Sequence, residues 1–385
     1  MQRIGVVTVI HDIGRGFGGA EVLAFEIARR LDRDRFRSFV CITHAPPPHR
    51  AEHVRATIEE LREAGVEVLP LNRQAWHDVT PWWRLFELIR TEKIDVVHAH
   101  LLRANLPSAV LARLARASVM IAHDHSWSFE GRRFRRFLDR RVIAPLTTRF
   151  LSVSEHDHTR LLEVVRLPAS KVVTLEMGMP DMSSPAGTDV RAELGVQADA
   201  PLVGAMGRLS QPKGFEVLIE AAKLLVEHVP DARVAIFGDG PERDALRGLI
   251  DRYGLQGVVM LGGHRSDVAD VLAALDVAVL PSHNEGRPVA LMEYMAAERP
   301  IVASRVGGVP ELVDDGVEAL LVEPGSAGAL AAAVRRMLED RGLALRLAAA
   351  AGSRQRSQLS MDVMMRRLEG LYLAELAEAD PAAAP

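Results

Sequence analysis

Short hydrophobic runs alternate with amphipathic segments along almost the whole chain. Runs of this length are typical of strands in a parallel sheet, because helices cover both faces of such a sheet and leave no polar side. The intervening segments are long enough for helices, so the pattern predicts a doubly wound α/β fold. In the first half the expected strands lie at residues 3–10, 38–43, 66–71, 95–100, 119–124 and 150–154.

The alternation stops at residues 176–200 and then begins again. The sequence EMGMPDMSSPAGTD in this region is rich in glycine, proline and serine, a composition typical of a linker. We therefore predict two Rossmann-like domains, at 1–175 and 176–360. Expected elements of the second domain are a helix at 214–229 and strands at 201–207, 233–238, 258–261, 277–281, 300–304 and 318–323.

Residues 326–380 read as mostly helical, with no strand after them. We expect residues 361–385 to form a closing helix that can pack back on the first domain, followed by a disordered Ala/Pro tail. The N-terminus lacks the features of a signal peptide. No apolar run reaches the roughly 18 residues that a membrane-spanning helix needs. The single cysteine, Cys41, excludes an internal disulfide and favours a reducing compartment. We therefore expect a cytoplasmic protein, bound to a membrane at most peripherally, at its inner face.

Charge is divided unevenly between the halves. Residues 1–175 carry a balance of +7 and the remainder −11, which together give the net charge of −4. This asymmetry is consistent with different partners for the two domains, and equally with sequence drift.

Ligands of doubly wound sheets bind outside the carboxyl ends of the strands, so the loops at those ends hold the candidate site. Gly207 ends one predicted strand, and Arg208 and Lys213 follow before a helix. Two cations beside a helix N-terminus favour a diphosphate site, although a solvated loop would look the same. Gly238 and Gly240 end the next strand, where they allow close approach to a ligand or form a tight turn.

A third loop carries two glutamates separated by seven residues. Glu285 lies in the loop, and Glu293 lies in the second turn of the helix that follows. Carboxylates suit sugar hydroxyls because each accepts two or more hydrogen bonds. Glu293 alone could be a solvated helix residue, whereas Glu285 has little packing reason to be at a strand end. Between them stand the residues of the helix start: Gly286, Arg287, Pro288 and Val289.

Together these motifs resemble the retaining GT-B glycosyltransferases of family four. The resemblance rests on G-R-x4-K at 207–213, the glycines at 238–240, P-S-x-x-E-G at 281–286, E-x7-E at 285–293 and G-G-x-P-E at 307–311. It covers the second half well, and in the first half it depends on GFGGAE at 16–21 and on His123. Departures from the family pattern are Met177 before Gly178, Tyr294 after the second glutamate, and Pro288.

The resemblance implies a role for each residue. Arg208 and Lys213 would bind the donor diphosphate, Glu293 the ribose, and Glu285 the donor sugar. Gly18 and Gly19 would close over the phosphates, and His123 would contact the transferred sugar or the acceptor. Family members retain anomeric configuration and usually need no metal, so we expect no cofactor besides the nucleotide-sugar co-substrate. The implied activity is transfer to a saccharide, lipid-linked saccharide or lipid in cell-envelope or polysaccharide biosynthesis.

Eleven of the fourteen histidines lie in the first half, and three pairs have H-x-H spacing: His98/His100, His123/His125 and His156/His158. On a strand this spacing puts both rings on one face, so a metal hydrolase is an alternative. Against it, Asp124 is the only acid with suitable spacing. We expect His123 to contact substrate and His156 and His158 to lie on a surface helix.

The segment 131–146 interleaves six arginines with apolar residues. Arg132–Arg141 could bind an anionic membrane surface or an anionic acceptor, or it could be an ordinary helix with a solvated basic face. No motif favours nucleic acid. The remaining alternatives are a GT-B-like epimerase, a phosphorylase, and a non-catalytic protein that binds a nucleotide sugar.

Overall fold

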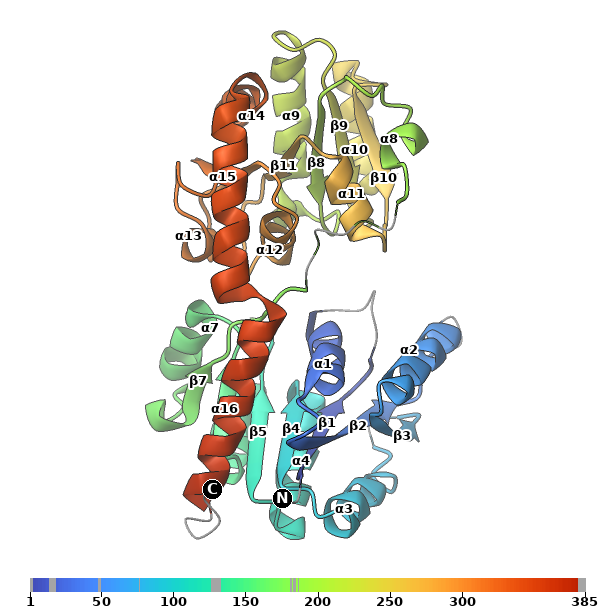
Figure 1. Cartoon of the computed structure of the whole chain (residues 1–385), viewed down its shortest axis with the longest axis vertical. Coiled ribbons are helices and arrows are strands. Elements are labelled where there is room, and N and C mark those ends of the chain that lie inside the picture. The colour runs from blue at the N-terminus through green and yellow to red at the C-terminus, as the bar shows by residue number, and fades with distance from the viewer. Residues whose placement is uncertain are drawn as a thin grey trace. The chain divides into compact units, whose positions relative to one another are not determined.

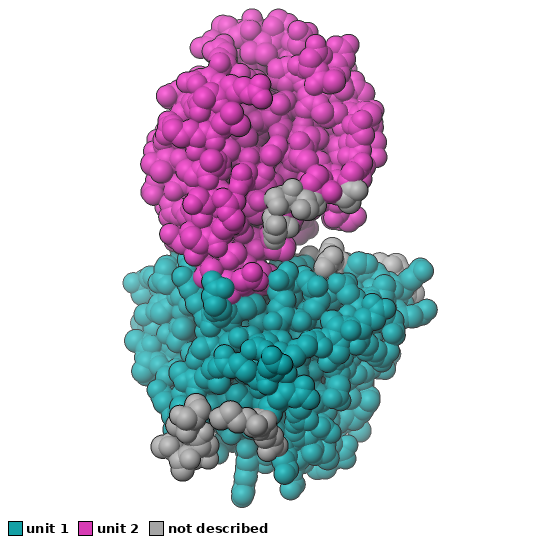
Figure 2. Space-filling model, in the orientation of Figure 1, with its two compact units in different colours: residues 1–177, 364–385 teal, residues 178–363 magenta. Residues whose placement is uncertain are grey.

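The structure is a computed structural model of the 385-residue chain, and it describes residues 3–13, 19–47, 50–75, 77–125, 133–180, 182, 185 and 187–379. The chain forms two compact units (Figure 2). Unit 1 comprises residues 1–177 and 364–385, and unit 2 comprises residues 178–363. These limits differ by two or three residues from the boundaries expected from the sequence.

Unit 1 is built on a seven-stranded parallel sheet in the order β3-β2-β1-β4-β5-β6-β7 (Figure 1). Successive residues of a strand enter opposite core layers. Phe39 and Cys41 pack into one hydrophobic cluster, and Val40 and Ile42 pack into another. Helices therefore cover both faces, as the continuous apolar runs predict. The strands are β1 (Ile4–Ile10), β2 (Phe36–His44), β3 (Glu67–Arg73), β4 (Val96–His100), β5 (Val119–His123), β6 (Arg149–Ser152) and β7 (Val172–Thr174).

The edge strand β7 is absent from the prediction. It has three residues, of which only Val172 is buried, so it leaves almost no hydrophobic signal. The helices of this unit before the linker are α1 (Gly19–Arg30), α2 (Ala51–Glu63), α3 (Trp82–Thr91), α4 (Leu102–Ala115), α5 (Arg133–Leu138), α6 (Ala144–Leu146) and α7 (Glu155–Arg160).

Unit 2 holds a six-stranded parallel sheet in the order β10-β9-β8-β11-β12-β13. Its strands are β8 (Leu202–Met206), β9 (Arg233–Phe237), β10 (Val259–Gly263), β11 (Val277–Leu280), β12 (Ile301–Ser304) and β13 (Leu320–Val322). The order reverses beside β8, and such a switch point is where ligands of doubly wound sheets bind. The helices are α8 (Val190–Glu193), α9 (Phe215–Val226), α10 (Arg243–Tyr253), α11 (Val268–Ala274), α12 (Val289–Ala296), α13 (Val309–Leu312), α14 (Ala327–Glu339) and α15 (Arg341–Arg354).

The last helix, α16 (Met361–Ala379), belongs to unit 1 from residue 364 onward. Leu368 and Tyr372 are fully buried there. The Glu369 carboxylate accepts a hydrogen bond from the backbone N–H of Asp32 at 2.9 Å, and Arg149 pairs with Glu375 at 2.7 Å. The final segment of the chain thus completes the core of the first unit. Among the described residues, no helix combines the length and apolarity needed to cross a bilayer.

Candidate functional site

The loop after β8 carries two cations in different environments. Arg208 is exposed, and its guanidinium makes no hydrogen bond or ion pair with the residues that the structure describes. Lys213 ends a short 3-10 turn (η5, Gln211–Lys213) just before α9. Its ammonium contacts both oxygens of the Glu285 carboxylate, at 2.8 and 3.0 Å. One cation is therefore available to a ligand, and the other already holds a site carboxylate.

Glu285 follows β11 and is buried, with 7% of its surface exposed. Besides Lys213, the Ser282 hydroxyl donates to its Oε1 at 2.7 Å. A buried carboxylate is stable only when it is paired and hydrogen-bonded, and both conditions hold here. These bonds fix the orientation of Glu285 before any ligand arrives.

Backbone contacts hold the strand-end loops against one another. The N–H groups of His283 and Asn284 donate to the Pro212 carbonyl at 2.9 and 3.3 Å, and Gly308 donates to the Glu285 carbonyl at 3.2 Å. Gly307 has a φ of +47°, and a Cβ there would lie 1.8 Å from the Glu285 carbonyl oxygen. Glycine at this position is thus required by the packing of one loop on another.

The same reasoning decides between the two interpretations of the glycines after β9. At Gly238, φ is +144° and a Cβ would lie 1.8 Å from the carbonyl oxygen of Gly207. At Gly240, a Cβ would lie 2.3 Å from the carbonyl oxygen of Leu209. Contact with the neighbouring loop accounts for both glycines, so approach to a ligand is not needed to explain them.

Helix α12 carries Glu293 and, in its first turn, backbone N–H groups that are free to donate hydrogen bonds. Its N-cap is Pro288, which is buried, and its first residue is Val289. The first three N–H groups of a helix have no acceptor within the helix and carry the positive end of its dipole. The half-buried Gly286 and Arg287 lead from Glu285 to this helix start.

The carboxyl group of Glu293 lies in the second turn of α12 and makes no hydrogen bond or ion pair with the described residues. Burial raises its pKa to about 7. The next residue, Tyr294, is fully buried, and its hydroxyl accepts a hydrogen bond from the N–H of Met206 at 2.8 Å. This bond anchors α12 to β8 and explains why a tyrosine fits there. Helix α12 is therefore anchored to the sheet, and the Glu293 carboxyl group that it carries has no partner among the described residues.

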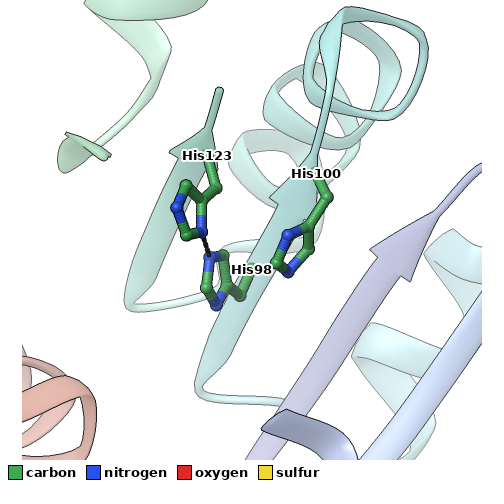
Figure 3. Close-up of side chains that lie close together, drawn as sticks. All are labelled: His98, His100 and His123. Carbon is green, nitrogen blue, oxygen red and sulfur yellow. Dashed lines mark hydrogen bonds between the residues drawn. The ribbon is translucent and has the colours of Figure 1, made fainter. Parts of the chain in front are cut away.

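In unit 1, His98, His100, His123 and His125 form a histidine cluster. Figure 3 shows His98 and His100 on β4 facing His123 on β5, where His100 and His123 are register partners. His98 Nε2 lies 3.1 Å from His123 Nδ1. Burial lowers the pKa of His98 and His125 to about 3 and holds the pKa of His100 and His123 well below the usual value. All four rings are neutral at physiological pH.

Three of these rings could hold a metal ion, because His98, His100 and His123 each offer a nitrogen within 4.8 Å of the others. Hydrogen bonds occupy most of the ring nitrogens, and His100 Nδ1 lies 2.9 Å from His125 Nε2. The H-x-H spacing thus indicated the shared face but not the cluster, which needs both strands and their register.

The other predicted residues of unit 1 are placed as follows. Gly18 lies outside the described residues, and Gly19 is the exposed first residue of α1. His156 lies on the surface of helix α7, whereas His158 is half-buried there, with Nδ1 2.9 Å from the Thr174 hydroxyl.

The basic segment differs from the prediction at one residue. Arg135 is buried and donates to both oxygens of Asp124, at 3.0 and 2.8 Å, because its guanidinium neutralises an acid at the end of β5. It therefore cannot serve an external anionic surface, and Arg132 lies outside the described residues. Phe134 and Phe137, in contrast, are 73% and 56% exposed.

Comparison with known proteins matches two family patterns to the two halves. "Glycosyltransferase Family 4" matches residues 17–180, and "Glycosyl transferases group 1" matches residues 188–354. The chain is 32% identical over 228 residues to an alpha-D-kanosaminyltransferase of Streptomyces kanamyceticus, covering 58% of this chain and 59% of that protein. It is 38% identical over 158 residues to the lipopolysaccharide core biosynthesis glycosyltransferase LpsE of Rhizobium meliloti, covering 41% and 45%. The matched region thus spans about half the length of these relatives.

The fold matches a solved structure over nearly its whole length. The Anabaena protein Alr3699/HepE, crystallised in complex with UDP, superposes with a TM-score of 0.79 at 22% identity, covering 96% of this chain and all of that one. The fold is therefore the GT-B arrangement of two Rossmann-like sheets, as expected. On the combined match of both halves, the chain belongs to family four of the GT-B glycosyltransferases.

Proposed function

We propose that this protein transfers a sugar from a nucleotide diphosphate sugar to a saccharide, lipid-linked saccharide or lipid acceptor in cell-envelope or polysaccharide biosynthesis. The main observation that supports this proposal is the arrangement of Glu285. It is a buried carboxylate oriented by Lys213 and Ser282 at a strand end, on the loop that leads into α12. Glu293 and the helix start offer the complementary groups for a nucleotide: an acceptor for hydroxyls and donors for phosphate.

Each group then has a role that follows from its surroundings. The exposed Arg208 and the N–H groups at the start of α12 bind the diphosphate. Lys213 holds Glu285 and adds positive charge beside the leaving group. Glu285 accepts hydrogen bonds from hydroxyls of the donor sugar, and Glu293 accepts those of the ribose. UDP bound to the Anabaena protein of the same fold supports a nucleotide diphosphate as the ligand.

We propose transfer with retention of configuration and without a metal ion. The bond between the sugar C1 and the diphosphate oxygen breaks, and the acceptor oxygen bonds to C1 on the same face. The acceptor proton passes to the departing phosphate oxygen. Arg208 and Lys213 supply fixed positive charge where negative charge develops, a contribution on the order of several kcal/mol in a dry site. EDTA should leave the rate unchanged, and NMR of the product should show the donor's anomeric configuration.

Donor binding is tested with a panel of UDP, GDP and ADP sugars, scored by thermal shift and by release of the free nucleotide. At least one donor should stabilise the protein and, with an acceptor present, yield nucleotide. Failure of every donor to bind would overturn the proposal.

We further propose a cytoplasmic location with peripheral contact to an anionic membrane through α5. Its exposed Phe134 and Phe137 are flanked by the exposed Arg133, Arg140 and Arg141. Interfacial binding has two components: aromatic rings that enter the membrane interface, and arginines beside them that contact lipid phosphates. Such a surface would bring the enzyme to a lipid-linked acceptor.

A further inference from the structure

The sheet of unit 1 is covered by different helices on its two faces. Helices α3 and α4, and the π-helical turn η2 (Asp139–Ile143) that continues α5, pack into one hydrophobic cluster, whereas α1 and α2 pack into another. His98 alternates along β4 with Val97 and Ala99 of the first cluster, so its side chain points to the opposite face. The Tyr372 hydroxyl lies 2.7 Å from His98 Nδ1, which places α16 on that opposite face too. We call the first surface the α3–α5 face.

Large exposed hydrophobic side chains of unit 1 are concentrated on the α3–α5 face. Trp83 of α3 is 59% exposed and Leu114 of α4 is 65% exposed, in addition to Phe134 and Phe137 of α5. Among the described residues, α1, α2 and α16 expose no large hydrophobic side chain. Single exposed apolar residues are normal on a protein surface, but their concentration on one face marks an interaction surface.

Charge distinguishes the two faces in the same way. The α3–α5 face has seven exposed arginines, two on α3, two on α4, one on α5 and two on η2, against one exposed acid, Glu87. The exposed charges of α2 are nearly balanced, with two arginines and three glutamates. The α3–α5 face therefore suits a partner that is anionic and can also bury apolar side chains.

An anionic bilayer has both properties, because lipid phosphates contact arginines and the interface takes up aromatic and leucine side chains. A nucleic acid would use the arginines but would leave Leu114 in water. We propose that the whole α3–α5 face, rather than α5 alone, lies against an anionic membrane, with the plane of the unit 1 sheet along the bilayer. Helix α5 supplies the most exposed ring, and α3 and α4 fix the orientation. The proposal rests on the membrane contact proposed above and is independent of sugar transfer.

Contact is tested at single positions with an environment-sensitive thiol label. The one native cysteine, Cys41, is buried, so the label attaches selectively to an introduced cysteine. On vesicles rich in phosphatidylglycerol, a label on Leu114→Cys should gain fluorescence and be quenched by lipids with brominated acyl chains. The matched control is Ala56→Cys, at an exposed position of α2, whose label should not change. A label at position 114 that responds no more than the control would overturn the proposal.

Sedimentation with the same vesicles measures affinity. Trp83→Ser combined with Leu114→Ser leaves α5 intact and should weaken binding about fivefold or more, because two exposed apolar side chains no longer enter the interface. Wild-type affinity in this variant, together with a loss in Phe134→Ser combined with Phe137→Ser, would overturn the extended face and leave the α5 contact standing.

A matched pair of charge variants separates a specific face from general attraction. Arg90→Gln combined with Arg113→Gln should weaken binding about tenfold or more, because each arginine near an anionic surface contributes to affinity. Arg55→Gln combined with Arg62→Gln removes the same charge from α2 and should leave binding near the wild-type value. Equal losses in the two variants would overturn the orientation.

Two further outcomes concern the partner and the function. Analytical ultracentrifugation without lipid should show the same association state for the wild-type protein and for Trp83→Ser combined with Leu114→Ser. A wild-type dimer that these substitutions dissociate would overturn the membrane assignment in favour of a second copy of the chain. Vesicle binding without any sugar transfer would instead overturn the proposed function and leave the surface standing.

Discussion

At the scale of single residues, Glu285 is the most constrained group of the site. Glu285→Gln keeps the size of the side chain and removes its charge, so the ion pair with Lys213 is lost. We expect transfer to fall by about 100-fold or more, because the sugar loses its oriented acceptor. Nucleotide binding should change little, since we propose that it depends on α12 and Arg208. Steady-state kinetics and calorimetric titration of the nucleotide measure the two effects.

The matched control is Glu216→Gln. Glu216 is a nearby glutamate that pairs with His283 at 2.6 Å, but its side chain is 40% exposed. The Glu216→Gln variant should transfer sugar at the wild-type rate. Equal losses in both variants would contradict a specific role for Glu285.

Glu293 should make donor affinity depend on pH. Its pKa is raised to about 7, so the carboxylate, which we propose accepts ribose hydroxyls, predominates at pH 8 and the protonated acid at pH 6. Ligand bonds favour the ionised form, and affinity should therefore fall by up to about tenfold from pH 8 to pH 6. A nucleotide-sugar donor suits the measurement because its diphosphate diester does not titrate in this range. The same dependence in Glu293→Gln would contradict the assignment.

Residue identities in the donor loops could be predicted from sequence, but their contacts could not. Glu285, Glu293, Arg208 and Lys213 stand at strand ends that hydrophobic runs locate well. The Lys213–Glu285 ion pair joins residues 72 positions apart, and only the order of strands in the sheet brings them together. Tyr372 gave no signal at all, because a tyrosine on an amphipathic helix looks like any other core residue.

At the scale of elements, helix α5 should govern membrane binding. Replacing Phe134 and Phe137 with serine removes two exposed rings without disturbing the core. We expect binding to vesicles rich in phosphatidylglycerol to weaken about tenfold or more, because each ring contributes on the order of 1 kcal/mol at the interface. Sedimentation with vesicles measures the change.

Leu345→Ser on α15 is the control, since Leu345 is 59% exposed in unit 2, on a helix that also carries Arg341 and Arg346. Equal loss in both variants would argue for nonspecific adsorption. Arg135→Ala is unsuitable for this purpose, because it would leave Asp124 buried without its partner.

Helix α16 should be necessary for unit 1 but not for unit 2. A chain ending at Ser360 loses Leu368 and Tyr372 from the unit 1 core, together with the bonds of Glu369 and Glu375. Losing several large core side chains costs more than the typical stability of a domain. Limited proteolysis should therefore degrade residues 1–177 and leave a resistant fragment near 188–354. A resistant first unit would contradict this expectation.

Helices and strands could be predicted where burial gives the sequence a clear hydrophobic pattern. The central strands are buried on both faces and appear as apolar runs, whereas β7 is too short to give a run. The π-helical turn at Asp139–Ile143 could not be predicted. It follows Arg135, whose buried bonds to Asp124 depend on tertiary structure.

At the scale of the whole molecule, a nucleotide should protect one unit selectively. The proposed contacts of the nucleoside diphosphate lie in unit 2, so saturating UDP or the donor identified above should slow hydrogen exchange at 207–214 and 282–293. At 100 times Kd the ligand stabilises its unit by about 2.7 kcal/mol. Exchange measured by mass spectrometry should show little change in β4 and β5. Protection confined to those strands would contradict the placement of the donor site.

Unit 1 is made from both ends of the chain, whereas unit 2 is one continuous segment. During synthesis on the ribosome, residues 178–363 are complete before the final helix has been translated. We therefore expect the second unit to reach its native state first, although the first unit leaves the exit tunnel earlier. Until α16 arrives, the nascent first unit exposes the groove that Leu368 and Tyr372 will fill, and its histidine cluster lacks Tyr372. Unit 1 thus acquires its complete core only after helix α16 has been synthesised.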